Sequence, residues 1–137
     1  MRYPGTDKKL GRVLNTLISD ANPFGLDPSD SASADDIVLL NEMHLPLNEP
    51  VILLLRSKDV IHSFFVPEFR FKQDTIPGLT TSVGFTANRT GQYEIACAEY
   101  CGLAHYRMRG SITVETRTDF DAWLLSQQVA GGTDVGR

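Results

Sequence analysis

The stretch QYEIACAEYCGLAHYRMRGSITVE, residues 92–115, carries the strongest structural and chemical signal in this chain. Its two ends, Gln92–Ala96 and Ser111–Glu115, are short strand-forming segments. Four side chains that bind soft metals lie in the connection between them: Cys97, Cys101, His105 and Met108. The stretch therefore predicts two strands joined by a metal-binding loop.

A second histidine stands far from this loop in the sequence. His62 precedes Cys97 by 35 residues and adjoins another predicted strand, Ser63–Val66. A β-sandwich can bring the ends of two strands together, so we expect His62 to complete the site. Taken alone, His62 would more often be a structural histidine, and Met108 would more often fill a core. The combination of all five side chains is what makes the signal specific.

The set of donors favours copper, because soft sulfur ligands with imidazole and a weak methionine are typical of copper electron-transfer sites. Zinc also accepts two cysteines and two histidines, so a zinc-stabilised binding module is an alternative. A disulfide between Cys97 and Cys101 would close a very small loop with little entropic benefit. A mononuclear blue copper site needs only one cysteine. The second thiolate is explained if both sulfurs bridge two metal ions.

The rest of the chain predicts an all-β domain between an irregular start and a flexible end. Further strands are expected at Ile37–Leu40, Val51–Arg56, Ser63–Val66 and Thr80–Thr86, separated by Pro, Gly and Asn. Many short strands at this spacing indicate an antiparallel sandwich or barrel. We expect an irregular N-terminal excursion at 1–36, the β domain at 37–128 and a flexible tail at 129–137.

Two helical patterns flank the predicted strands. Leu10, Val13, Leu14 and Leu17 follow helical spacing, although Gly11 weakens that pattern. Near the other end, Thr118 with Asp121 resembles a capping box. It is followed by an apolar stripe of Phe120, Trp123 and Leu124, which predicts a C-terminal helix.

Composition excludes several classes of function. The chain has 42% hydrophobic and 22% charged residues, as in an ordinary globular domain. Its net charge of -4 argues against nucleic-acid binding, which needs a basic face. The longest aliphatic run, Val51–Leu55, is far shorter than the roughly 20 residues of a membrane span. We therefore expect no membrane anchor within this chain.

These motifs resemble the CuA domain of cytochrome c oxidase subunit II. The resemblance extends from the segment Asn41–Pro46 to Trp123. Besides the loop from Cys97 to Met108, it rests on these residues: His62-Ser63-Phe64, Pro67, Lys72, Asp74, Pro77-Gly78, Gly91 and Tyr93.

The resemblance implies a cupredoxin-like Greek-key β-barrel or sandwich, with a C-terminal helix, that holds two copper ions. By this resemblance Cys97 and Cys101 bridge the coppers, and His62 and His105 bind one copper each. Met108 and the backbone carbonyl of Glu99 are then weak ligands. The Glu99 side chain would also help to hold a magnesium ion in the intact oxidase.

The resemblance further implies a respiratory oxidoreductase complex located in the periplasm, on the outer face of the cytoplasmic membrane. The site would accept electrons from cytochrome c, or from a fused cytochrome c domain, and pass them to haem in subunit I. The domain by itself would be an electron carrier without substrate chemistry of its own. Glu68 and Asp74 are candidate docking residues for a basic partner.

Other classes of protein share some of these features. The CuA domain of nitrous oxide reductase is similar around the copper loop, but Lys72-Gln73-Asp74 with Pro77-Gly78 favours the oxidase. A quinol oxidase subunit is disfavoured, because those members lack the copper ligands. A copper-delivery protein is disfavoured too, because a buried site with five side chains would hinder metal release.

Overall fold

The computed structural model describes residues 1–131 of the chain, with side chains up to residue 128. Two compact units are present: Leu40–Phe120, and Met1–Leu39 together with the residues from Asp121 onward. Of the flexible tail predicted at 129–137, residues 129–131 instead form the end of a helix, and residues 132–137 lie outside the described residues. The division into 1–36, 37–128 and 129–137 stays a prediction.

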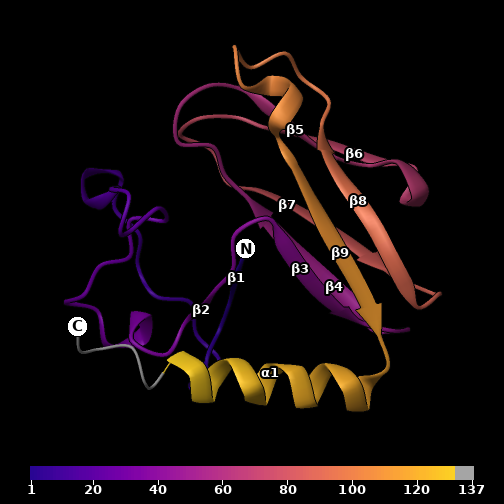
Figure 1. Ribbon diagram of the computed structural model, residues 1–137. Helices are drawn as coiled ribbons and strands as arrows, with labels where there is room; N and C mark the ends of the chain where they lie inside the picture. The colour runs from indigo at the N-terminus through magenta and orange to yellow at the C-terminus, as the bar shows by residue number, and fades with distance from the viewer. Residues whose placement is uncertain (132–137) are drawn as a thin grey trace. The chain divides into compact units, whose positions relative to one another are not determined.

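The unit Leu40–Phe120 is built from two β-sheets (Figure 1). Five strands form the first sheet in the order β3-β9-β8-β5-β6. Their bounds are Glu42–Pro46 for β3, Arg109–Glu115 for β9, Gly91–Cys97 for β8, His62–Val66 for β5 and Phe71–Thr75 for β6. The second sheet pairs β4 (Pro50–Leu55) with β7 (Thr81–Thr86) in antiparallel register. Short 3-10 helices, η3 (Pro67–Phe69) and η4 (His105–Arg107), lie in the connections.

The predicted all-β class with a C-terminal helix is confirmed, but two strands and one pairing of the large sheet were not foreseen. Neither β3 nor β6 was predicted, because the first ends in Pro46 and the second reads FKQDT, which is mostly polar. The other pairs of the large sheet are antiparallel, whereas β3 runs parallel to β9, from Glu42 opposite Ser111 to Pro46 opposite Glu115. A purely antiparallel sandwich was therefore the wrong expectation.

Apolar side chains pack the two sheets of this unit together. Ile112 and Val66 are fully buried in the middle of the large sheet, and Val83 is buried on β7. The ring of Phe85 on β7 contacts Phe69 and Phe71, with centroids 5.5 and 6.1 Å apart. This core fixes the strand ends on which the functional residues stand.

The unit that contains the N-terminus has little regular structure. Its strands β1 (Arg2–Tyr3) and β2 (Ile37–Val38) pair in antiparallel fashion. The helical spacing of the leucines predicted a helix here, but the structure has only η1 (Asn15–Leu17) and, further on, η2 (Ser31–Ser33). Gly25 adopts a φ of +66°, and a Cβ there would lie 2.3 Å from the carbonyl oxygen of Leu14. This close approach folds the segment into a loop instead of a helix.

The C-terminal helix α1 extends over Arg117–Gly131 and is capped by a different residue from the one predicted. Thr116 accepts a hydrogen bond from the backbone N–H of Asp119 at 3.2 Å, and its hydroxyl donates to the Asp119 carboxylate at 2.7 Å. The capping pair is therefore Thr116 and Asp119, two residues before Thr118 and Asp121. Within residues 1–131, no helix is both long and apolar enough to cross a bilayer.

Candidate metal centre

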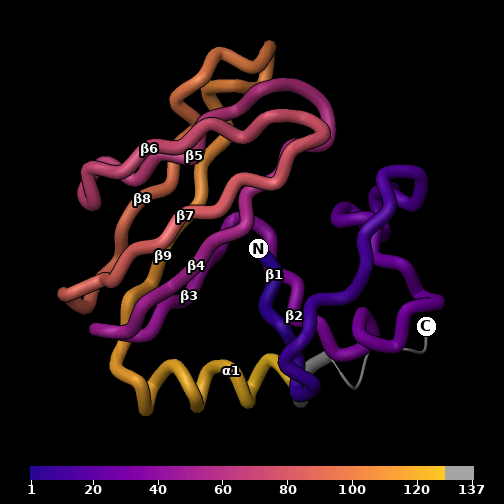
Figure 2. Tube along the Cα trace, turned by 180° about the vertical axis from the view of Figure 1, so that it is seen from behind, coloured from indigo at the N-terminus to yellow at the C-terminus, as the bar shows by residue number. Residues whose placement is uncertain are grey.

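The ends of two paired strands of the large sheet meet at one end of the sandwich. His62 opens β5 and Cys97 closes β8, and these two strands are paired, with Phe64 opposite Cys97. Figures 1 and 2 show the loop 98–108 between β8 and β9 at this end of the sheet. The pairing brings His62 close to a loop that lies 35 residues further along the chain.

The loop is closed by backbone hydrogen bonds. The N–H of Cys97 donates to the carbonyl of Met108 at 3.2 Å, and the N–H of Ala98 donates to the carbonyl of Ser63 at 3.0 Å. Within the loop, η4 turns the chain back, with the N–H of Met108 bonded to the carbonyl of His105 at 3.1 Å. Gly102 adopts a φ of +131°, a conformation that favours glycine. These contacts direct His105 and Met108 back toward Cys101.

The structure brings all of the sequence-predicted ligand atoms together. The Sγ atoms of Cys97 and Cys101 lie 3.8 Å apart, and both cysteines are free thiols. The Nδ1 atom of His62 is 4.0 Å from Cys97 Sγ, and the Nδ1 atom of His105 is 3.6 Å from Cys101 Sγ. Met108 Sδ lies 3.1 Å from Cys101 Sγ. Each thiol therefore has its own imidazole, and the thioether stands beside Cys101.

The backbone carbonyl of Glu99 also points into this cluster, at 3.2 Å from Cys97 Sγ. Its side chain is exposed. The oxygen donor and the thioether thus stand next to different sulfur atoms.

The surroundings of the two thiols shift their pKa values in opposite directions. Burial disfavours the Cys97 thiolate, but hydrogen bonds from the backbone of Ser63 and Glu99 and from the His62 ring outweigh it, and the pKa of Cys97 falls to about 7. The pKa of Cys101 is raised, first by burial and then by the neighbouring Cys97. In the metal-free protein, one thiol of the pair thus ionises well before the other.

The ring of His62 is held from its other side by an aspartate that sequence reasoning missed. His62 Nε2 lies 2.7 Å from the Oδ1 of Asp59. Burial tends to lower the pKa of His62, but the hydrogen bonds to Asp59 and Cys97 outweigh it, so the pKa is raised. The bond to His62 is also the largest cause of the lowered pKa of Asp59. The sequence did contain a signal for this contact, because Asp59 stands three residues before the candidate ligand His62.

The two predicted docking residues have different surroundings. Glu68 is exposed, whereas Asp74 is half-buried and accepts a hydrogen bond from the hydroxyl of Ser63 at 2.7 Å. Ser63 is only 1% exposed and stands directly opposite Asp74 in the β5–β6 pair. Asp74 thus supports the strand that carries His62, while the docking role of both acids stays a prediction.

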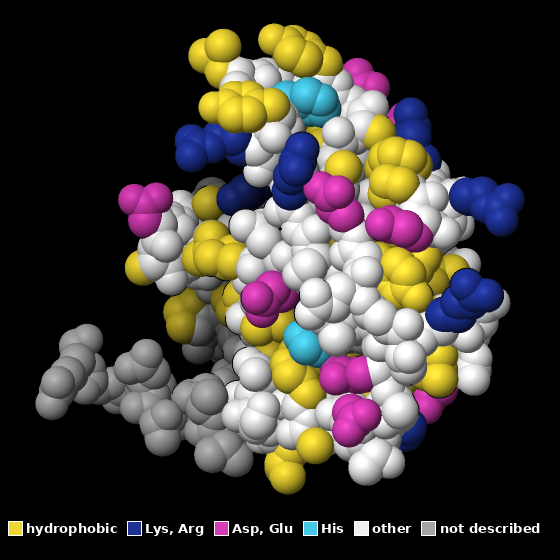
Figure 3. All heavy atoms as spheres, turned by 45° about the vertical axis from the view of Figure 1, so that its right-hand side comes forward, with side chains coloured by type: hydrophobic (Ala, Val, Ile, Leu, Met, Phe, Trp, Pro, Cys, Tyr) yellow, Lys and Arg dark blue, Asp and Glu magenta, His cyan; other side chains and the backbone are white. Residues whose placement is uncertain are grey.

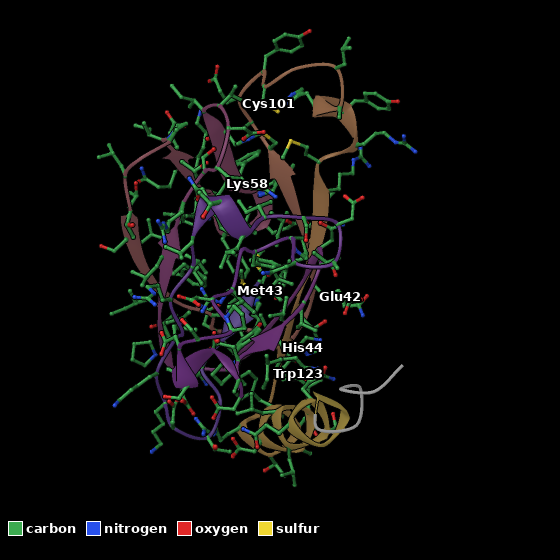
Figure 4. All side chains as sticks on the ribbon, turned by 90° about the vertical axis from the view of Figure 1, so that its left-hand side faces the viewer. Glu42, Met43, His44, Lys58, Cys101 and Trp123 are labelled. Carbon is green, nitrogen blue, oxygen red and sulfur yellow. The ribbon has the colours of Figure 1, made fainter. Side chains whose placement is uncertain are left out.

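The cluster borders an open pocket of about 570 Å³, whose lining includes His62, Cys101, His105 and Met108. The side chains of Tyr100, Leu103 and Tyr106 project from the loop beside it, with 77%, 95% and 72% of their surfaces exposed. Figure 3 shows hydrophobic side chains around a histidine at this end of the molecule, and Figure 4 places Cys101 at the same end. The site thus lies under an apolar, solvent-facing rim.

These donors fit copper: two thiols, two imidazoles, a thioether and a carbonyl oxygen converge on one location, a soft set typical of copper sites. A two-sheet β-sandwich with such a cluster at one end is the architecture of a cupredoxin-like metal-binding domain.

The family described as cytochrome c oxidase subunit II, periplasmic domain, matches residues 26–116. The chain belongs to this family. Membership confirms the predicted periplasmic location and favours the oxidase over the nitrous oxide reductase alternative.

Individual relatives agree with this assignment. The alternative cytochrome c oxidase subunit 2 of Bradyrhizobium diazoefficiens is 46% identical over 132 residues, which cover 96% of this chain and 48% of that protein. Cytochrome c oxidase subunit 2 of Thermostichus vulcanus is 45% identical over 101 residues, which cover 74% of this chain and 31% of that protein. The chain thus spans less than half the length of these curated relatives.

A solved structure supports the fold as well. The crystal structure of the periplasmic domain of subunit II of cytochrome oxidase from Bradyrhizobium japonicum has a TM-score of 0.62 and 34% sequence identity. The match covers 66% of this chain and 65% of that one.

Proposed function

We propose that this domain holds a dinuclear copper centre of the CuA type and carries electrons within a haem–copper oxidase. The observation that supports it most directly is the pairing of two thiols, 3.8 Å apart, with one imidazole each. A mononuclear site would leave one of these thiol–imidazole pairs without a purpose. Two metal ions would use every donor in the cluster.

The proposed ligands are His62, Cys97, Cys101, His105 and Met108, with the carbonyl of Glu99. When bound, the copper pair would accept and release one electron at a time. The protein contributes rigidity, because His62 is fixed by a paired strand and the loop is closed by the bond between Cys97 N–H and the Met108 carbonyl. Ligands that cannot move keep the geometry the same in both redox states, which lowers the reorganisation needed for transfer.

Partners are proposed from the family and the surface. We infer that cytochrome c, or a fused cytochrome c domain, supplies electrons, and that haem in subunit I receives them. The apolar rim of Tyr100, Leu103 and Tyr106 suits a protein interface beside the centre. A cryo-EM structure of a heme-copper terminal oxidase dimer contains a similar chain, 31% identical with a TM-score of 0.52, covering 55% of this chain and 51% of that one. In such a complex, the exposed Glu99 side chain is a candidate ligand for magnesium.

Metal loading requires both thiols in reduced form. A subunit II relative, 32% identical with a TM-score of 0.59, covering 68% of this chain and 70% of that one, was crystallised as a mixed disulfide intermediate with a thioredoxin-like protein. The free Cys97–Cys101 pair of this chain is close enough to be oxidised by a modest local movement. We therefore propose that a thiol reductant acts on this chain before copper binds.

Copper loading of the reduced protein tests the function. We expect two coppers per chain by metal analysis, an intense purple colour, and an unpaired electron shared by two copper nuclei in the electron paramagnetic resonance spectrum. Cys97→Ser and Cys101→Ser should each abolish the paired signal. A blue protein with one copper, or a colourless protein that prefers zinc, would overturn the proposal.

A further inference from the structure

We propose that Asp59 is a positioning residue for His62, which fixes the imidazole so that its Nδ1 lone pair faces the thiols. The inference deepens the proposed metal centre and rests on it for its purpose. The contact joins two side chains of this chain, so it can be tested separately from metal binding.

The geometry places the His62 ring between two groups of different chemistry. Its Nδ1 atom faces Cys97 Sγ at 4.0 Å, and its Nε2 atom faces Asp59 Oδ1 at 2.7 Å. An ionised carboxylate can only accept hydrogen bonds, so Nε2 must carry the hydrogen. Once the ring has lost its Nδ1 proton, as metal binding requires, its lone pair is on Nδ1, on the side of the cluster. A metal-binding histidine commonly donates its second N–H to a carboxylate in this way.

The local fold holds Asp59 in place. Asp59 and Ser57 are linked through the serine hydroxyl, which lies 3.3 Å from Asp59 Oδ1 and 3.4 Å from the Asp59 backbone nitrogen. The same hydroxyl also bonds the carbonyl of Val60. The turn between β4 and β5 thus presents the carboxylate to a ring that is only 18% exposed.

The second ligand histidine is held differently. Among the side chains described, residues 1–128, no carboxylate bonds to the His105 ring; the ring contacts the thiols, with Nδ1 3.6 Å from Cys101 Sγ. Tyr100 lies beside this ring, with centroids 5.8 Å apart. The chain therefore anchors one imidazole by a charged acceptor and the other by its loop alone. Of the two imidazoles, loss of Asp59 should disturb His62 and leave His105 in place.

Nitrogen-15 NMR of the metal-free, reduced protein tests the contact directly. Three histidines are present, so His44 and His105 serve as internal references. At about pH 8.5, where an ordinary histidine is neutral, we expect His62 to show a protonated Nε2 with a slowly exchanging proton. Asp59→Ala should lose that slow exchange and shift the His62 nitrogen signals. Asp59→Asn should restore part of the effect, because its amide oxygen can still accept the hydrogen bond.

Glu42→Gln is the matched control for loss of one negative charge. Glu42 is exposed on β3, and Figure 4 shows it well away from Cys101. This variant should leave the His62 signals unchanged. Asp59 is 64% exposed, so the Asp59 variants should also fold normally, which circular dichroism verifies.

Copper-loaded protein supplies the second readout. Removing a negative charge beside a ligand disfavours the oxidised centre, so Asp59→Asn and Asp59→Ala should raise the reduction potential, and Glu42→Gln should not. Unchanged His62 signals in Asp59→Ala would overturn the positioning role, even if the wild type binds two coppers. Failure of the wild type to bind two coppers would instead remove the proposed function and leave the NMR result standing.

Discussion

Ionisation of Cys97 in the metal-free protein can be isolated with one substitution. The chain has two cysteines, so Cys101→Ser leaves Cys97 as its single thiol. The groups that lower the pKa of Cys97 from 9.0 to about 7 are the backbone of Ser63 and Glu99 and the rings of His62 and His105. These groups remain in the Cys101→Ser variant, which removes only the coupled second thiol, so we expect its pKa to stay lowered.

The magnitude follows from the two pKa values. At pH 7, a thiol with a pKa of about 7 is roughly half ionised, against about 1% for a pKa of 9, a difference of about 50-fold in thiolate. A less basic thiolate is also a weaker nucleophile, by about tenfold over two pKa units. The expected net gain in alkylation rate is therefore only about fivefold. The midpoint of the pH profile is the sharper quantity.

Iodoacetamide alkylation, followed by mass spectrometry over neutral and alkaline pH, measures this midpoint. We expect half of the maximal rate near pH 7 in the folded variant and near pH 9 in the same protein unfolded by urea. Since the folded pKa is the lower one, the thiolate stabilises the fold fully above about pH 9. That stabilisation is lost as the pH falls through 7.

Adding His62→Ala to this variant serves as the control, because it removes one of the hydrogen bonds to the thiolate. The midpoint should then move upward, toward that of the unfolded chain. A folded Cys101→Ser protein whose midpoint stays near 9 would refute the hydrogen-bonding account of this thiol.

Three further substitutions probe the site and the core. Met108→Leu should retain two coppers and shift the reduction potential; loss of both metals would contradict a weak-ligand role. Ser63→Ala removes the 2.7 Å hydrogen bond to Asp74, and should lower the free energy of unfolding in urea by about 1.5 kcal/mol. An equal loss in a protein that already carries Asp74→Ala would show that this bond is not the cause. Ile112→Ala empties a fully buried position and should cost about 3 kcal/mol in the same assay; a loss below about 1 kcal/mol would mean that the core tolerates the cavity.

The sequence alone determined the chemistry of the site and the general class of the fold. Ligand types and their spacing in the loop 97–108 are local properties, readable because one short connection must present all of them. The main strands could also be predicted, since each is a short strand-forming run bounded by Pro, Gly or Asn. The local pattern did not fix where the C-terminal helix begins. Two possible capping pairs have the same spacing of three residues, Thr116 with Asp119 and Thr118 with Asp121. The start that forms is set by where β9 ends, at Glu115.

The sequence predicted that His62 completes the site, but only the tertiary structure decided which strands pair to bring it there. His62 reaches Cys97 because β5 pairs with β8, and strand pairing is a long-range choice that local pattern does not encode. The parallel pairing of β3 with β9 could not be predicted from the sequence for the same reason. Local pattern was also insufficient for the contact between Asp59 and His62. The separation of three residues could be read from the sequence, but the contact could not. The turn that aims the Asp59 carboxylate at Nε2 exists only in the folded chain, because side-chain direction depends on backbone geometry that composition does not specify.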